Sequence, residues 1–215
     1  HPIPKMGKQP EPIQFVHNSG WVQAPGAEIL GDSLRHDELE NYIKGVVRHF
    51  KDDERVVAWD LYNEPDNVAN QPGRSELEVK DKHIYSLALL KKVVQWTREI
   101  NPSQPLTVGL WKGDHTLWGT PEKLRPLERF MVENSDVISF HSYDGPELTK
   151  EKIEVLKNYN RPLLCTEYMA RTNASTFESI LPILKENEVH AINWGFVAGK
   201  TNTIFPWSSW RTEFD

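Results

Sequence analysis

The chain has 215 residues, of which 38% are hydrophobic and 26% charged, a composition typical of one globular domain with a sizeable core. Its formal net charge of −6, with lysines and arginines scattered among acidic residues, excludes a broad basic surface and disfavours nucleic acid or another polyanion as partner. A single cysteine, Cys165, excludes an intrachain disulfide and a cysteine-based metal cluster.

Residues 1–36 are rich in proline and glycine and show neither a helical nor a strand-like repeat, which predicts a long irregular segment. Its first residues lack the charged and apolar regions of a signal peptide, and the chain does not begin with methionine. No apolar stretch approaches the length that spans a bilayer, so we expect no membrane partner. This beginning is consistent with a processed product or a fragment of a longer protein.

From residue 37 onward, helix-like repeats alternate with short apolar runs. The helix-like repeats have apolar residues three or four positions apart, including Tyr42, Ile84 and Leu156. The expected strands are residues 56–62, 105–111, 137–143, 162–168 and 191–197. Short apolar strands that each follow an amphipathic helix predict an α/β fold, in which helices cover a parallel sheet of buried strands.

The last expected helix has residues that mark its start and a proline that can interrupt it. Ser175 and Glu178 have the spacing of a capping box, which predicts that a helix begins there. Pro182 lies inside the same repeat and predicts either a kink or a later start, because proline lacks the backbone N–H that a helix interior uses.

Two architectures share this alternation, an open doubly wound sheet and a closed eight-stranded barrel, and the strand ends favour the barrel. An open nucleotide-binding sheet has a glycine-rich turn after its first strand, but the sequence contains neither G-x-G-x-x-G nor G-x-x-x-x-G-K-[ST]. In a barrel, catalytic side chains project from the C-terminal ends of several strands. The expected strands end in Asn63-Glu64, Trp111, His141 to Tyr143, Glu167 and Trp194.

Two of these strand ends carry a glutamate, and two such carboxylates can approach each other across a barrel opening. Retaining glycoside cleavage uses one carboxyl as acid and base and another as nucleophile, about 5–5.5 Å apart. Glu64 is the candidate proton donor and Glu167 the candidate nucleophile. Asn63-Glu64-Pro65 alone is more often a surface turn, so the hypothesis depends on the pair.

The strand ends resemble those of glycoside hydrolase clan A, and most closely its cellulase- and mannanase-like family 5. The residues that carry the resemblance are Asn63-Glu64-Pro65, His141, Tyr143, Glu167 and Trp194. The resemblance implies that Asn63 hydrogen-bonds the sugar 2-hydroxyl, that Glu64 is the acid/base and that Glu167 attacks the anomeric carbon. It also implies that Tyr143 holds the nucleophile and that His141 lines the site, although a buried core histidine is the usual alternative.

Aromatic residues are expected to form the walls of a sugar-binding cleft. The resemblance implies that Trp194 forms the floor, whereas without it a place in the core is equally plausible. Trp111 is predicted to bind substrate as well. Weaker candidates for the cleft wall are Trp21, Trp118 and His17. Trp207 and Trp210 are expected to pack on the barrel exterior or within the loop after the last strand.

The resemblance covers residues 37–215 and implies a (β/α)8 TIM barrel of which strands four to eight, with their helices, are present. Residues 1–36 then resemble the loop after the third strand, and an arginine that the family brings from its second strand has no counterpart. We therefore expect the chain to be a fragment, or a second chain to supply the missing strands.

The resemblance implies a retaining glycosidase that cleaves a β-linked polysaccharide or oligosaccharide without metal or cofactor, secreted or periplasmic because its substrate lies outside the cytoplasm. A metal-dependent hydrolase would need several histidines and carboxylates at strand ends, and only His141 is so placed. The alternative that stays open is a non-catalytic carbohydrate-binding or assembly fragment of such a barrel. Hydrolysis and binding measured on the same β-glucans and β-mannans distinguish the two.

Overall fold

The computed structural model describes residues 1–9, 11–69, 74–195 and 199–212. The strands are β1 (Trp59–Asp60), β2 (Leu106–Thr107), β3 (Ile138–Ser142), β4 (Leu163–Tyr168) and β5 (His190–Ala191). The α-helices are α1 (Ala27–Leu30), α2 (Glu40–Phe50), α3 (Lys82–Ile100), α4 (Pro126–Asn134), α5 (Pro146–Leu156) and α6 (Phe177–Glu186). Within these ranges, no helix combines the length and the apolar character that crossing a membrane requires.

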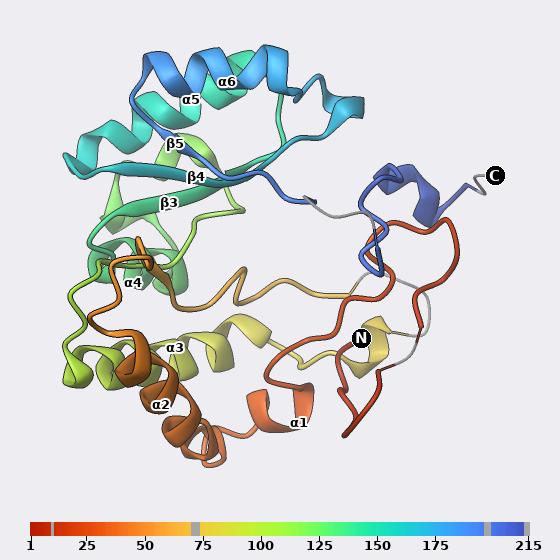
Figure 1. The fold of residues 1–215 in the computed structure, drawn as a ribbon, viewed down its shortest axis with the longest axis vertical. Helices are drawn as coiled ribbons and strands as arrows, with labels where there is room; N and C mark the ends of the chain where they lie inside the picture. Colours follow the sequence, from red (N-terminus) through yellow and green to blue (C-terminus); the bar gives the residue numbers. More distant parts are fainter. Residues whose placement is uncertain (10, 70–73, 196–198, 213–215) are drawn as a thin grey trace.

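All strand pairs are parallel, and the strands lie side by side in chain order. β1 pairs with β2, and β3, β4 and β5 form a second sheet in that order. The Leu110 N–H donates to the Ser139 carbonyl at 2.9 Å and the His141 N–H donates to the Leu110 carbonyl at 2.8 Å, which joins the two sheets. The predicted α/β class with a parallel sheet is therefore confirmed (Figure 1).

The sheet does not close into a barrel within the described residues, and its two outer strands differ from the expected buried runs. Val57, beside β1, is 78% exposed and Ile192, after β5, is 57% exposed. Each lies at an edge where no further described strand covers it. Burial is therefore confirmed for β3 and wrong for β1, which is half-buried at Trp59 and exposed at Asp60, and for β5, whose residues are exposed. The expected strand 191–197 is shorter here, and positions 196 and 197 lie outside the described residues.

The main core lies between the sheets and helices α3 to α6. Phe140 and Leu110 are fully buried at its centre, and Trp118 packs among them from the β2–α4 connection. Figure 1 shows α5 and α6 on one side of β3, β4 and β5, with α4 on the other. Two apolar residues of the expected helix faces lie outside the core instead, since Tyr42 is 71% and Ile84 58% exposed.

Helix α6 begins one residue later than the sequence pattern predicts. Thr176, not Ser175, is the N-cap, and its hydroxyl accepts from the Ser179 N–H at 3.3 Å while the Ser179 hydroxyl accepts from the Thr176 N–H at 3.0 Å. This reciprocal pair is a capping box with serine in place of glutamate at the third helical position. The helix continues through Pro182 to Glu186.

The N-terminal segment and the loop after β5 lie side by side (Figure 1). The Asn18 N–H donates to the Thr201 carbonyl at 2.7 Å, and the His17 N–H donates to the Ser209 hydroxyl at 2.9 Å. The described residues of the segment 1–36 are mostly irregular, apart from the helical turn α1 and the start of a 3₁₀ turn at His36. These contacts bring His17 and the loop after β5 together on the side where β3 and β4 end.

Candidate active site

A cavity of about 380 Å³ opens at the C-terminal ends of the strands. All seven predicted site residues line it: Asn63, Glu64, Trp111, His141, Tyr143, Glu167 and Trp194. They come from five separate parts of the chain, which the parallel strands bring to one edge. The structure thus gathers the whole predicted set, while the catalytic and binding role of each residue stays a prediction.

His141 lies between the two candidate catalytic carboxylates. Its Nδ1 shares a hydrogen bond with Glu64 Oε1 at 2.7 Å and lies 3.6 Å from Glu167 Oε2. One oxygen of each glutamate and one nitrogen of His141 lie within 4.8 Å of one another. The side chains are largely buried, with exposed fractions of 15% for Glu64, 13% for Glu167 and 3% for His141.

An irregularity in the β3–β4 ladder brings Glu167 opposite His141. The register pairs Phe140 with Cys165 but His141 with Glu167, so β4 has one extra residue, Thr166, at this point. Such a bulge turns the following side chain toward the other face of the strand. Tyr143 lies two residues after His141 and therefore faces the same side.

Tyr143 holds Glu167 through a short hydrogen bond. Its hydroxyl donates to Glu167 Oε2 at 2.6 Å. Burial raises the pKa of Glu167, while the charge of His141 and this hydrogen bond partly offset that rise. Burial and the negative charge of Glu167 raise the pKa of Tyr143, so the hydroxyl stays protonated and donates across the working pH range.

The surroundings of His141 favour its charged form. Burial lowers the pKa of His141, but the hydrogen bond with Glu64 and the negative charge of Glu167 outweigh burial, and the net shift is upward. A protonated imidazole between the two glutamates offsets part of their mutual repulsion. Sequence reasoning found this histidine but assigned it only a place in the wall of the site.

Glu64, His141 and Glu167 are also the group, among the described residues, that could offer three ligand atoms to a metal ion. Two ligands of one tetrahedral zinc ion, each about 2.0–2.2 Å from the metal, lie about 3.4 Å apart. The His141–Glu64 distance of 2.7 Å is instead that of a direct hydrogen bond. His141 and Glu64 are therefore arranged to share a proton directly, and His141 faces Glu167 at 3.6 Å.

Asn67 is a site residue that sequence reasoning missed. Its Nδ2 donates to Glu64 Oε2 at 2.5 Å, and it lines the cavity. It lies three residues after Glu64, in the turn that Pro65 begins, and its own N–H donates to the Glu64 carbonyl at 2.9 Å. Proline followed by aspartate and asparagine is a turn signal, so the return of Asn67 toward Glu64 could have been anticipated.

The aromatic residues of the cavity differ from the sequence prediction at three positions. Trp118 is 1% exposed and belongs to the core, with its indole N–H donating to the Lys112 carbonyl at 3.2 Å. Trp207 and Trp210 do lie in the loop after the last strand, in a 3₁₀ turn, but they line the cavity. The weaker candidates Trp21 and His17 also line it.

Residues with positive φ angles lie at or near both glutamates. Glu64 itself has a φ of +42°, and Met169, two residues after Glu167, has a φ of +91°. Residues other than glycine adopt positive φ at a cost of about 1–3 kcal/mol, and such strain gathers at functional sites. The surrounding contacts therefore hold both segments in place.

One family model matches most of the chain. The model of the cellulase family, glycosyl hydrolase family 5, matches residues 16–199. No curated protein sequence gives a significant match.

Solved structures share the fold at low sequence identity. A β-mannanase of the blue mussel Mytilus edulis has a TM-score of 0.55 at 14% identity, and a β-1,4-mannanase of the sea hare Aplysia kurodai has 0.55 at 16%. The alignments cover 86% and 82% of this chain and 62% and 59% of those two chains. A β-glucuronidase of Bacteroides uniformis has a TM-score of 0.57 at 15% identity, covering 79% of this chain and 22% of that one. The chain thus spans less than two thirds of each of these structures.

Proposed function

The chain belongs to the cellulase family, glycosyl hydrolase family 5, and from this premise we propose that it is a retaining glycoside hydrolase. The observation that carries the proposal is the short separation of the two carboxylates, whose nearest ligand atoms lie within 4.8 Å at one cavity. Retaining enzymes have carboxyl groups about 5–5.5 Å apart, whereas inverting enzymes need about 6.5–9.5 Å to admit a water molecule.

Glu64 and Glu167 have different surroundings, and we assign each a different role in the reaction. Glu167 attacks the anomeric carbon and forms a covalent glycosyl-enzyme, while Glu64 gives its proton to the departing glycosidic oxygen. Water then cleaves the intermediate, with Glu64 accepting the proton from that water. The Tyr143 hydroxyl holds Oε2 of the nucleophile in place, which leaves its other oxygen available for attack.

The substrate class we propose is a β-linked glucan or mannan. Asn63 lines the cavity beside Glu64, where an amide can hydrogen-bond a sugar hydroxyl. Trp111, Trp194 and Trp207 offer flat apolar faces with a polar edge, which suit a sugar ring. The fold likeness to two mannanases supports a β-1,4-linked polysaccharide.

A proton NMR time course on β-glucan and β-mannan oligosaccharides tests this proposal. We expect the new reducing end to appear first in the β configuration and to reach the α form only by mutarotation. An α product at the first time points would mean inversion. Binding of the same oligosaccharides with no hydrolysis would instead support the non-catalytic carbohydrate-binding alternative.

Replacing Tyr143 with phenylalanine is expected to move the acidic limb of the pH–activity profile to higher pH. Glu167 must be ionised to attack, so activity is lost as pH falls through its pKa, and removing the hydroxyl removes a hydrogen bond that lowers that pKa. A hydrogen bond to a charged group contributes about 1.5–3 kcal/mol, and one pKa unit is about 1.4 kcal/mol, so we expect a shift of about one to two pH units.

Tyr159→Phe is the matched control for this measurement of kcat/KM against pH. The Tyr159 hydroxyl donates to the Trp118 carbonyl, and Tyr159 does not line the cavity. An acidic limb that stays in place in Tyr143→Phe, or moves equally in both variants, would contradict the assigned contact.

We further propose that the protein acts outside the cytoplasm, where a polysaccharide is met, and that additional strands cover the exposed edges at Val57 and Ile192. These strands would come from a further part of the polypeptide or from a second chain. Fractionation of cells that make the full-length protein tests the first proposal. Light scattering on residues 1–215 alone tests the second, and a cooperatively melting monomer would count against it.

A further inference from the structure

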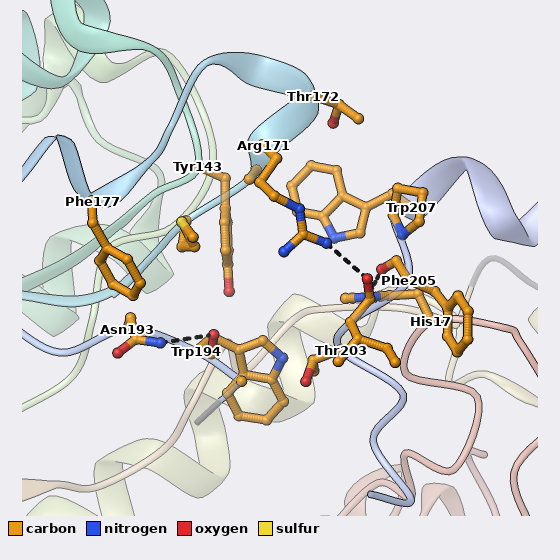
Figure 2. Close-up of a pocket in the computed structure, with 15 residues that line it drawn as sticks. His17, Tyr143, Arg171, Thr172, Phe177, Asn193, Trp194, Thr203, Phe205 and Trp207 are labelled. Carbon is orange, nitrogen blue, oxygen red and sulfur yellow. Dashed lines mark hydrogen bonds between the residues drawn. The ribbon is translucent and has the colours of Figure 1, made fainter. Parts of the chain in front are cut away.

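A second cavity, of about 230 Å³, adjoins the catalytic cavity between the turn after β4 and the loop after β5 (Figure 2). The two cavities share four lining residues: His17, Tyr143, Trp194 and Trp207. Tyr143 also holds Glu167, so a ligand in the second cavity lies one side chain away from the nucleophile. A glycan bound across the catalytic carboxylates can therefore extend into the second cavity.

The two cavities differ in charge. The catalytic cavity is lined by Glu64, Asp144 and Glu167, and its one lysine, Lys152, pairs with Asp144 at 2.5 Å. Among the described residues that line it, the second cavity has Arg171 and no aspartate or glutamate. A positively charged pocket thus lies beside the acidic one in a protein whose net charge is negative.

Arg171 is held in place, but within the described residues its charge is not paired. Its Nη2 donates to the Ile204 carbonyl at 2.7 Å, and Figure 2 shows the side chain extending from the turn after β4 toward the C-terminal loop. In the part of the chain that the structure describes, no carboxylate lies within 4.0 Å of the guanidinium. A guanidinium has five N–H donors, so the single bond to Ile204 leaves most of them for a ligand.

The rest of the second cavity suits a sugar ring. Tyr143 and Trp207 contact each other edge to face, with ring centroids 5.1 Å apart, and Trp194 and Phe177 add further aromatic surface (Figure 2). Asn193 and Thr172 contribute polar groups that can bind sugar hydroxyls. An aromatic wall beside a planar cation is an arrangement that fits a pyranose carrying a negative group.

We propose that the second cavity is a subsite for an acidic sugar, whose carboxylate or sulfate group pairs with Arg171 while its ring packs on Trp194 and Trp207. The proposal rests on the proposed glycosidase function and narrows its substrate class. A net charge of −6 disfavours a long polyanion. The substrate is therefore a largely neutral glycan that carries an isolated acidic residue close to the bond that is cleaved.

The competing role for Arg171 is purely structural, because its bond to the Ile204 carbonyl ties the turn after β4 to the C-terminal loop. Loss of such a tether would weaken the binding of neutral and acidic ligands alike. Loss of a charge partner would weaken only the acidic ligand. The ratio of the two affinities therefore distinguishes the roles.

The test is calorimetric binding in the protein with Glu167→Gln, so that bound oligosaccharide is not cleaved. The probes are a neutral β-1,4-linked glucose or mannose tetrasaccharide, the same compound with one sugar oxidised at C6 to the carboxylate, and its 6-O-sulfate. We expect tighter binding of at least one acidic probe, a preference for carboxylate or sulfate that identifies the natural group, and loss of that preference at high salt because exposed charges are screened.

Arg171→Gln is expected to weaken binding of the preferred acidic probe about tenfold and that of the neutral probe less than about twofold. Arg171→Lys keeps the charge without the fork of donors and should fall between. The control is Arg48→Gln, which removes an exposed arginine from α2, a helix that lines neither cavity. Equal weakening of all probes, or no binding of either acidic probe, overturns the proposal.

Different results would refute the glycosidase hypothesis and the acidic-subsite hypothesis. Hydrolysis of neutral glycans without a preference for acidic probes would leave the glycosidase assignment in place and refute the acidic subsite. An Arg171-dependent preference in a protein that hydrolyses nothing would refute catalysis and support the subsite.

Discussion

Glu167→Ala is expected to lower kcat on unactivated β-glycans by on the order of 10⁴-fold or more, because no other group can form the covalent intermediate. Glu167 is the carboxylate that Tyr143 holds, at 2.6 Å, and His141 faces, at 3.6 Å. The measurement is the release of reducing ends from the oligosaccharide that the wild-type protein cleaves fastest. Folding is checked by near-ultraviolet circular dichroism.

Glu133→Ala is a suitable control, since Glu133 lies on α4 in a surface pair with Arg129 and lines neither cavity. Added azide should restore turnover in Glu167→Ala by entering the space of the lost carboxylate, and the glycosyl azide should have the inverted configuration. A Glu167→Ala variant with near-normal turnover would refute the nucleophile assignment.

Glu64→Ala is expected to have an effect that depends on the leaving group. General acid catalysis contributes about 10²–10⁴-fold, and it matters most when the departing oxygen is a poor leaving group. We expect kcat/KM on oligosaccharides to fall within that range and the rate of glycosyl-enzyme formation from dinitrophenyl glycosides to change little. Steady-state and burst kinetics on both substrate types provide the measurement.

The same loss on both substrate types would contradict the acid/base role of Glu64. Asn67→Ala is the informative companion variant, because Asn67 donates to Glu64 Oε2 but carries no proton to the substrate. A loss that is smaller than in Glu64→Ala, but has the same leaving-group dependence, would mean that Asn67 acts by orienting the acid.

The site residues at strand ends could be predicted from the sequence, because the C-terminal ends of parallel strands lie at one edge of the sheet. Glu64, His141 and Glu167 each follow an apolar run, and that local pattern sufficed to bring them together. The bulge that sets Glu167 opposite His141 could not be read from the sequence, since it depends on how β4 pairs with β3.

The predictions from the sequence were wrong where tertiary contacts determine the position of a residue. Trp118 looked like a cleft wall because tryptophan suits both cores and sugar sites, and only packing against its neighbours placed it in the core. Trp207 reaches the cavity because the loop after β5 bonds to the N-terminal segment, a contact between residues nearly 200 positions apart. The choice of Thr176 as the N-cap of α6 depended on which of two adjacent hydroxyls could reach the first turn of the helix.

The positive φ angles at Glu64 and Met169 each carry a cost in stability. A sequence selected for stability alone would have glycine or asparagine at both positions, because those residues adopt such angles at less cost. Met169 can be exchanged in this way, but Glu64 cannot without loss of its carboxylate. Directed evolution toward heat resistance should therefore remove Glu64 as soon as selection for activity is relaxed, whereas Met169, which lines the second cavity, should be replaced only by residues that keep ligand binding there.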